Sequence, residues 1–513
     1  MARRLRFPQA AVATPHYLAT SAGLGALARG GNAFDAVLAA NLALGVVAPY
    51  FCGYGGDVFA IVWDGSLHGY LGSGRSAAAA SLADAGEGFG GRLPPFGGAV
   101  VTVPGAVAGW FDLLERFGTR SFGDLAGSAV GLARDGFEVT PQAAVAFDES
   151  RAFYRGFDAW NAAYGSVGTG DVLRQPAMAR TIATLAADGP EAYYRGPIAD
   201  AIAEAAQAAG GVLTAADLAT HAGEWTTPLS ATYRDAEVFE LPPPTQGVSA
   251  LEALRILDGL QPPESGAGRE HALLEATKQA LADRDRWVTD PDAMPVPAST
   301  LLSGRWVESR RRAIDPDRAG TPDPGEPQPG GTAYLCAADA DGMFVSLIQS
   351  NFIHFGSGVH VPEWGINLNN RGFSFSLDAD RPNALAPAKR PMHTIIPAMV
   401  LRDGAPWGAF GSMGGDAQVP VHVQVLHRIL AETADGADAI HAPRWRVDVD
   451  SWRVHAESRF DAATLDGLRA LGHEVTTTGP FDSGMGHAHA VWRTGGGYGA
   501  TSDPRSEGAA LGR

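Results

Sequence analysis

The clearest change in the pattern of apolar and polar positions comes where an irregular segment gives way to a strand. Residues 315–331 contain five prolines and end in two glycines, which removes backbone donors and blocks both helix and central strand. From Thr332 the side chains follow a period of two, with Tyr334 and Cys336 on one face. An Asp-Gly turn at 341–342 and a second apolar run follow. This pattern predicts a β-hairpin that begins at Thr332.

Helical spacing dominates the first half of the chain. Residues 19–29 and 33–47 read as two helices, separated by glycines that stop the first and by Asn32, which caps the second. Further helices are predicted at 104–117, 121–134, 141–153, 177–188, 197–209, 247–260 and 269–288.

Strands are predicted on both sides of this helical part. A hairpin is expected from 58–63 and 68–71, after a Gly-rich turn, and one strand from 233–241 before three prolines. In the second half, 417–431 is predicted to be a helix. Strands and helices mixed in this way indicate an α+β fold in which layers pack on one another.

Composition restricts the class of protein. The 513 residues are 45% hydrophobic, enough for a large core, and the net charge of −17 argues against a nucleic-acid partner. Cys52 and Cys336 are too few for a disulfide framework or a metal site and are expected to be small buried residues.

Targeting signals and membrane spans are not expected. The basic start of the chain lacks an apolar region of signal-peptide length, and no run approaches 18 uninterrupted apolar residues. We therefore predict a cytoplasmic protein without a membrane partner.

Thr332 has the setting of an N-terminal nucleophile. If the Gly331–Thr332 bond were cut, Thr332 would carry a free α-amine with a pKa of about 8 beside its hydroxyl. That amine could take the hydroxyl proton without a separate histidine. From the hairpin alone, the favoured interpretation of Thr332 is an ordinary β-branched residue that starts a strand.

The motifs around this hairpin resemble those of the γ-glutamyltranspeptidase family. TAYLCAADADGMFVSLIQSNFIHFGSG, GINLNN, KRP and GSMGGD match the small subunit, and the stretch from HYLATSAG to AIVWDG matches the opening of the large one. The resemblance runs over nearly the whole chain. It implies a four-layer αββα sandwich of the N-terminal-nucleophile hydrolase type that cleaves itself.

The resemblance also implies two fragments that stay together as a heterodimer, and these could dimerise further. Residues 1–331 would form the large subunit, with a helical part at 104–290 and a leader at 315–331, and residues 332–513 the small subunit. No metal or cofactor is implied. The partners would be a small amide substrate and water.

Site residues are carried over from the family position by position. Arg75 would bind the substrate carboxylate through paired, charge-assisted hydrogen bonds. Ser350 would contact the nucleophile, and Gly414 and Gly415 would offer backbone N–H groups to an oxyanion. Asn370 belongs to an asparagine pair beside the family's active centre. Without the resemblance, these residues would be a solvated arginine, a polar strand end and two turns.

Departures from the family concern the substrate. Where the family binds the α-ammonium group, this chain has Phe352 and Arg371, and His393 and Thr394 replace a pair of serines. The pocket is thus expected to be apolar and cationic. That combination is similar to the branch that hydrolyses oxamate, a small amide beside a carboxylate.

The predicted function is therefore hydrolysis of a small carboxylate-bearing amide through a Thr332 acyl-enzyme. A γ-glutamyl hydrolase or transferase is the alternative, followed by a β-lactam or glutaryl acylase. A different class, a non-catalytic homologue that only binds, is disfavoured by the presence of Thr332. His487 and His489 could reach a metal by spacing, but no cluster supports this, and we assign them no catalytic role.

Overall fold

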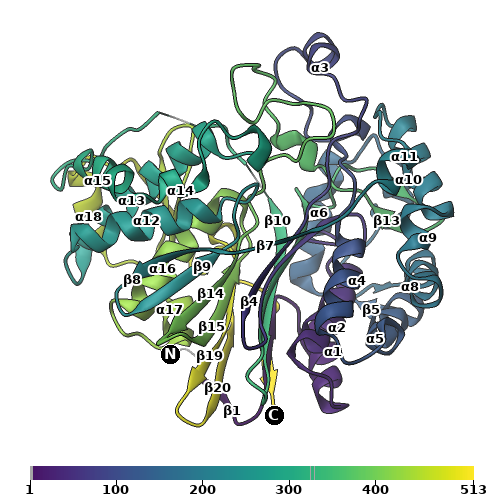
Figure 1. The fold of residues 1–513 in the computed structure, drawn as a ribbon, viewed down its shortest axis with the longest axis horizontal. Helices are drawn as coiled ribbons and strands as arrows, with labels where there is room; N and C mark the ends of the chain where they lie inside the picture. The colour runs from purple at the N-terminus through teal and green to yellow at the C-terminus, as the bar shows by residue number, and fades with distance from the viewer. Residues whose placement is uncertain (1–3, 324, 329) are drawn as a thin grey trace.

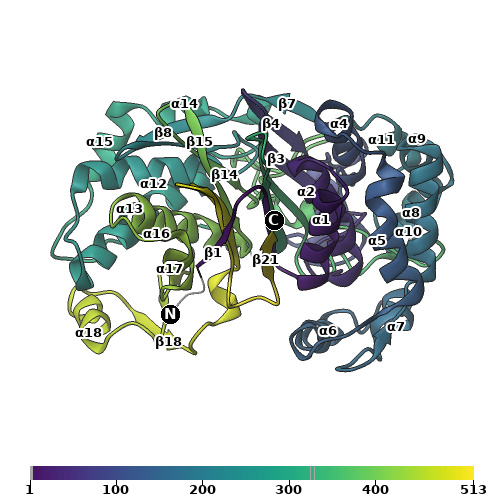
Figure 2. The same ribbon diagram turned by 90° about the horizontal axis from the view of Figure 1, so that it is seen from below.

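The structure is a computed structural model that describes residues 4–323, 325–328 and 330–513. In this part of the chain two seven-stranded antiparallel sheets lie face to face, and helices cover the outer face of each (Figure 1). Seen from below, the helices form two groups on either side of the sheets (Figure 2). The predicted four-layer αββα sandwich is confirmed.

Each sheet combines strands from both ends of the chain. The first sheet contains, in spatial order, β21 (Ala509–Gly512), β2 (Ala11–Thr14), β10 (Gly331–Ala338), β11 (Phe344–Phe352), β3 (Asp57–Trp63), β4 (Leu67–Gly72) and β7 (Glu224–Thr226). The second contains β1 (Leu5–Phe7), β20 (Gly497–Ser502), β19 (Ala488–Thr494), β15 (Ala405–Ser412), β14 (Pro397–Arg402), β9 (Ala236–Glu240) and β8 (Leu229–Tyr233). Fragments 1–331 and 332–513 would therefore share both sheets, which would hold them together after a cut.

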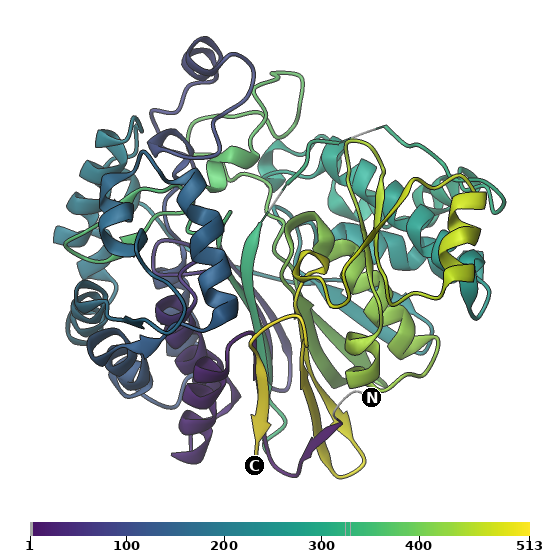
Figure 3. The same cartoon turned by 180° about the vertical axis from the view of Figure 1, so that it is seen from behind.

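The helices form two groups, one beside each sheet (Figure 3). Those on the side of the first sheet are α1 (Tyr17–Ala28), α2 (Ala33–Val47), α4 (Ala106–Phe117), α5 (Phe122–Asp135), α6 (Pro141–Phe153), α7 (Asp158–Tyr164), α8 (Pro176–Asp188), α9 (Glu191–Tyr194), α10 (Pro197–Ala208) and α11 (Ala215–Ala219). Those on the side of the second are α12 (Gly247–Leu260), α13 (Gly266–Trp287), α14 (Ala298–Leu301), α15 (Gly304–Arg312), α16 (Gln418–Leu430), α17 (Gly436–His441) and α18 (Ala462–Ala470).

Short elements complete the fold. Helix α3 (Leu82–Phe89) projects beyond one end of the sheets. The small strands are β5 (Phe137–Glu138) with β6 (Val172–Leu173), β12 (His360–Val361) with β13 (Ile366–Asn367), and the group β16 (Trp445–Val447), β17 (Val454–Glu457) and β18 (Val475–Thr478). The 3₁₀ turns are η1 (Gly98–Val100), η2 (Pro291–Ala293), η3 (Arg371–Ser374), η4 (Gly415–Ala417) and η5 (Ser483–Met485).

Local sequence signals place the long helices of the first half correctly. Asn32 caps α2 in a capping box with Asp35, and all nine helices predicted in the first half are present with small shifts at their ends. The strand predicted at 233–241 is present as β9 but starts three residues later, because Arg234 adopts a positive φ of 57° and turns the chain between β8 and β9. Helix α3 escaped prediction because two glycines interrupt its short sequence.

The central hairpin has the predicted faces. Tyr334 and Cys336 pack in the core between the two sheets, whereas Leu335 and Ala337 pack under the helices on the outer face. Cys52 is buried like Cys336, and burial raises the pKa of both thiols. The cysteines are thus core residues, as predicted.

No helix among the described residues combines the length and the apolar character needed to cross a bilayer.

Candidate active site

Thr332 lies at the start of β10, buried beside Ser350 at the end of β11. The Thr332 hydroxyl donates to Ser350 Oγ at 3.3 Å, and the Ser350 hydroxyl donates to the carbonyl oxygen of Gly331 at 2.7 Å. Ser350 Oγ also accepts the Phe352 N–H at 2.8 Å. One serine therefore orients the threonine hydroxyl and binds the carbonyl of the peptide bond that precedes it.

The alternation of side chains along the strands determines which layer holds this pair. Ser350 shares its face of β11 with Ile348, and its direct partner on β3 is Asp57. Because cross-strand partners point to the same face, Thr332, Ser350 and Asp57 all lie at the edge of the layer between the two sheets.

Gly414 and Gly415 approach this edge from the second sheet, between β15 and α16. Their φ values of +136° and +60° are ones that side-chain-bearing residues rarely adopt. Gly330 packs directly on the pair, since a Cβ on Gly330 would lie 3.2 Å from the Cα of Gly415. The segment before Thr332 thus covers the predicted oxyanion glycines in the continuous chain.

A polar network fixes this segment. The Gln328 N–H donates to the Asp416 carboxylate at 2.7 Å, and the Asp416 N–H donates back to the Gln328 carbonyl at 3.1 Å. Arg284 of α13 donates to Asp416 and to the side chain of Gln246. Gln246 donates in turn to the carbonyl of Gly415 at 3.1 Å. Sequence reasoning missed Gln246 and Arg284, which carry no recognisable motif.

Arg75 follows β4 but is held by other groups. It donates to Asp290 at 3.1 Å and to the Ala388 carbonyl at 3.0 Å, and its side chain is 43% exposed. Asp290 also pairs with Arg390 of the KRP motif at 3.0 Å. No hydrogen bond or ion pair joins Arg75 to Thr332 or Ser350 within the described ranges.

Asn370 is committed to the backbone. Its side-chain oxygen accepts the Ile353 N–H at 3.0 Å, and its nitrogen donates to the Pro95 carbonyl at 2.8 Å. The side chain of its neighbour Asn369 likewise accepts the Thr102 N–H at 3.3 Å and donates to the Gly55 carbonyl at 3.0 Å. The asparagine pair therefore positions the loops around the site.

Arg371 and His393 lie together in the interior around Asp57, and Thr394 is also buried. The guanidinium of Arg371 is 3.8 Å from the Asp57 carboxylate, which is also 3.3 Å from His393 Nε2. Burial and the neighbouring Arg371 lower the pKa of His393, so its imidazole is neutral at pH 7. The buried Thr394 hydroxyl has no partner among the described residues. Sequence reasoning did not identify Asp57 as a residue of this cluster. The only signal near it was the Gly-rich turn that precedes it.

A cavity of about 540 Å³ opens beside Gly331, the residue that precedes Thr332. The residues that line it include Gly331, Gly414, His16, His487 and Glu507. A cavity of this size accommodates an organic ligand.

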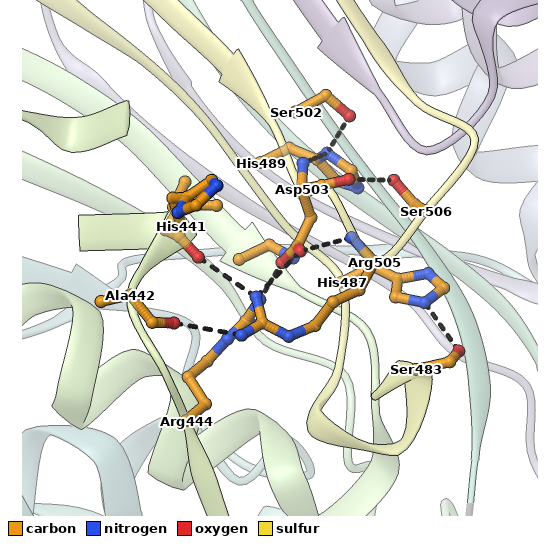
Figure 4. Close-up of polar contacts among 12 residues, drawn as sticks. His441, Ala442, Arg444, Ser483, His487, His489, Ser502, Asp503, Arg505 and Ser506 are labelled. Atoms are coloured by element: carbon orange, nitrogen blue, oxygen red, sulfur yellow. Dashed lines mark hydrogen bonds and ion pairs between the residues drawn. The ribbon is translucent and has the colours of Figure 1, made fainter. Parts of the chain in front are cut away.

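His487 and His489 are both buried and bind different serines, Ser483 at 2.8 Å and Ser502 at 3.0 Å (Figure 4). Only His489 lies in a strand, β19, because His487 precedes it. Between them Asp503 binds Arg444 and Arg505. Burial alone would raise the pKa of Asp503, but the two guanidinium groups hold it well below its usual range. Both histidines therefore belong to a buried hydrogen-bonded network.

Buried neutral histidines predict a loss of stability in mild acid. Burial lowers the pKa of His16 and of His487 to about 4, against about 6.5 in the unfolded chain. At a pH between these two pKa values, each histidine is protonated in the unfolded state but not in the folded state. The free energy of unfolding should therefore fall with decreasing pH, by about 1.4 kcal/mol per pH unit for each histidine.

Thermal unfolding at pH 7, 5.5 and 4.5 measures this effect. His487→Gln should give a shallower dependence of Tm on pH than the unchanged chain. A Tm that stays constant over this range would contradict the assignment.

One described cluster has ligands close enough for a metal ion, namely His271, Glu275 and His473. Lys278 already supplies a cation there, donating to Glu275 at 2.8 Å. His271 and His473 bind each other at 2.8 Å. The cluster is therefore satisfied as a hydrogen-bonded ion pair.

Known proteins share both the sequence and the fold. The profile of the family described as Gamma-glutamyltranspeptidase matches residues 19–513. The oxamate amidohydrolase proenzyme of Klebsiella pneumoniae subsp. pneumoniae is 37% identical over 97% of each chain. The glutathione hydrolase-like YwrD proenzyme of Bacillus subtilis is 34% identical over 98% of each. The crystal structure of cephalosporin acylase from Bacillus halodurans superimposes with a TM-score of 0.96 at 36% identity, covering 100% of this chain and 97% of that one.

The fold is therefore that of the N-terminal-nucleophile hydrolases. Within that class, the chain belongs to the γ-glutamyltranspeptidase family, as its motifs predicted. Its relatives are hydrolases that act on amide bonds, and several are named as proenzymes.

Proposed function

We propose that this chain is a self-cleaving amidohydrolase with Thr332 as its nucleophile. The observation that carries the proposal is the bridge that Ser350 makes between the Thr332 hydroxyl and the Gly331 carbonyl. In processing, Thr332 Oγ attacks the Gly331 carbonyl carbon, and the C–N bond breaks to leave an ester and a free α-amine. Water then hydrolyses the ester, releasing the Gly331 carboxylate.

The same hydroxyl would then act on the substrate. The α-amine of Thr332 takes the hydroxyl proton while Oγ attacks the amide carbon. Backbone N–H groups at Gly414 and Gly415 bind the oxyanion, which typically stabilises the transition state by about 3–4 kcal/mol per donor. The amine passes the proton to the leaving nitrogen, and water cleaves the acyl-enzyme. These steps call for no cofactor.

The proposed substrate is a small amide that bears a carboxylate, of the oxamate type. Support comes from the buried guanidinium of Arg371 and from Phe352, which stands where the family binds an ammonium group; Arg75, the carboxylate-binding position carried over from the family, is paired with Asp290 in this structure. A relative named as an oxamate amidohydrolase, 37% identical, points the same way.

A larger amide is the second candidate, because the cavity beside Gly331 and Gly414 measures about 540 Å³. Ammonia would leave most of that space empty. A γ-glutamyl amide or an acylase substrate would have a leaving group that fills it.

Two substrates separate these candidates. Processed protein should release ammonia from oxamate and release little p-nitroaniline from γ-glutamyl-p-nitroanilide. The reverse preference would favour the second candidate. A fully processed protein that hydrolyses neither, nor any larger acyl amide, would overturn the proposed activity and favour a homologue that only binds.

A further inference from the structure

The guanidinium of Arg371 is buried without a hydrogen bond. Its side chain is 0% exposed, and none of its three nitrogens has a partner among the described residues. The group stacks on the ring of Phe352, with its central carbon 4.1 Å from the ring centroid. Since buried polar groups are nearly always hydrogen-bonded, these five N–H donors call for an acceptor that a ligand would supply.

Asp57 balances the charge of Arg371 but does not satisfy its donors. One carboxylate oxygen of Asp57 accepts the Gly74 N–H at 3.1 Å, and the other lies 3.3 Å from His393 Nε2 and 3.8 Å from Arg371 Nε. A planar guanidinium with free donors matches the two oxygens of a carboxylate.

The guanidinium lies close to the proposed nucleophile. Asp57 is the cross-strand partner of Ser350, and the Phe352 N–H donates to Ser350 Oγ. Arg371 therefore contacts two residues that are direct neighbours of Ser350, the serine that holds the Thr332 hydroxyl.

We infer that Arg371, set between Asp57 and the ring of Phe352, binds the substrate carboxylate, and that the substrate is a short amide whose carboxylate lies next to the scissile carbonyl and which has no α-ammonium group. The inference rests on the proposed function and deepens it. It assigns the main carboxylate contact to Arg371, whereas Arg75 is already bound to Asp290 and Ala388.

Access to Arg371 depends on Phe352. In the continuous chain Gly331 pairs with Phe352 across β10 and β11, and Phe352 has a φ of +82°, which aromatic residues rarely adopt. Cleavage after Gly331 would release this pairing and free the Phe352 ring to move. The carboxylate pocket would then form only in the processed enzyme.

The test compares oxamate with oxamide, its neutral analogue, on proteins whose processing is verified by intact mass. Arg371→Gln should lower kcat/KM for oxamate by about 100-fold or more and leave oxamide within about threefold. Arg371→Lys should keep part of the oxamate activity. Arg92, an exposed arginine that stacks on Phe373 of the same segment, gives the matched control Arg92→Gln, which should behave as the unchanged protein.

Three results would overturn the inference while the proposed function stands. One is Arg371→Gln with full oxamate turnover. Another is a loss of oxamate turnover in Arg75→Gln but not in Arg371→Gln. The third is an unchanged protein that hydrolyses oxamide as well as oxamate. If Arg371→Gln is not cleaved after Gly331, Arg371→Lys tests the inference instead. Its ratio of oxamate to oxamide turnover must be lower than that of the unchanged protein. Processed, unchanged protein without any amidase activity would instead overturn the proposed function, and this inference with it.

Discussion

Replacing Thr332 by alanine is expected to leave the chain whole and abolish amide hydrolysis. The variant lacks the only hydroxyl that Ser350 holds beside the Gly331 carbonyl in the described structure, so neither the acyl shift nor the acyl-enzyme can form. The loss should reach about 10⁴-fold or more, as for other nucleophile deletions. Intact mass and ammonia release from oxamate measure the two effects.

Thr332→Ser is the matched control, because serine retains the hydroxyl and gains the same α-amine on cleavage. It should process and turn over substrate, though more slowly, since serine lacks the methyl group that restricts the χ1 rotamer of threonine. A Thr332→Ala protein that is cut at residue 331, or that hydrolyses oxamate, would remove Thr332 from the mechanism.

Ser350→Ala should slow self-cleavage by about 100- to 1000-fold. The Ser350 hydroxyl donates to the Gly331 carbonyl at 2.7 Å, the oxygen on which negative charge develops when Thr332 attacks. Loss of one such donor typically costs about 2.7–4 kcal/mol of transition-state stabilisation. Freshly purified protein, sampled over time and analysed by denaturing electrophoresis, gives the rate at which full-length chain disappears.

Ser350→Thr provides the comparison, because a threonine hydroxyl can make the same three contacts. It should process at nearly the rate of the unchanged chain. Equal rates for the alanine variant and the unchanged chain would show that Ser350 has no part in cleavage, and its contacts would then be structural.

Local patterns in the sequence predicted much of this fold. The period of two from Thr332, the Asp-Gly turn and the prolines before it placed β10 and β11 and the faces of Tyr334 and Leu335 correctly. Helix α2 and its cap at Asn32 followed from short-range signals. The four layers came from the family resemblance, since strand order joins residues hundreds of positions apart.

The polar contacts of the site could not be predicted in the same way. Asp57 meets Arg371 only because β3 pairs with β11 and Arg371 of η3 packs against Asp57 of one strand and Phe352 of the other. Arg75 is drawn to Asp290, and Asn370 to the backbone of Ile353, through tertiary contacts that no local spacing encodes. The roles of Arg75, Asn370, Gly414 and Gly415 and the cytoplasmic location stay predictions.

Intact-mass analysis of the purified, unchanged protein tests the central claim most directly. The account predicts two fragments that remain associated, residues 1–331 and residues 332–513, with Thr332 as the new N-terminus. A single stable chain of 53.4 kDa, or a cut at any other bond, would contradict it.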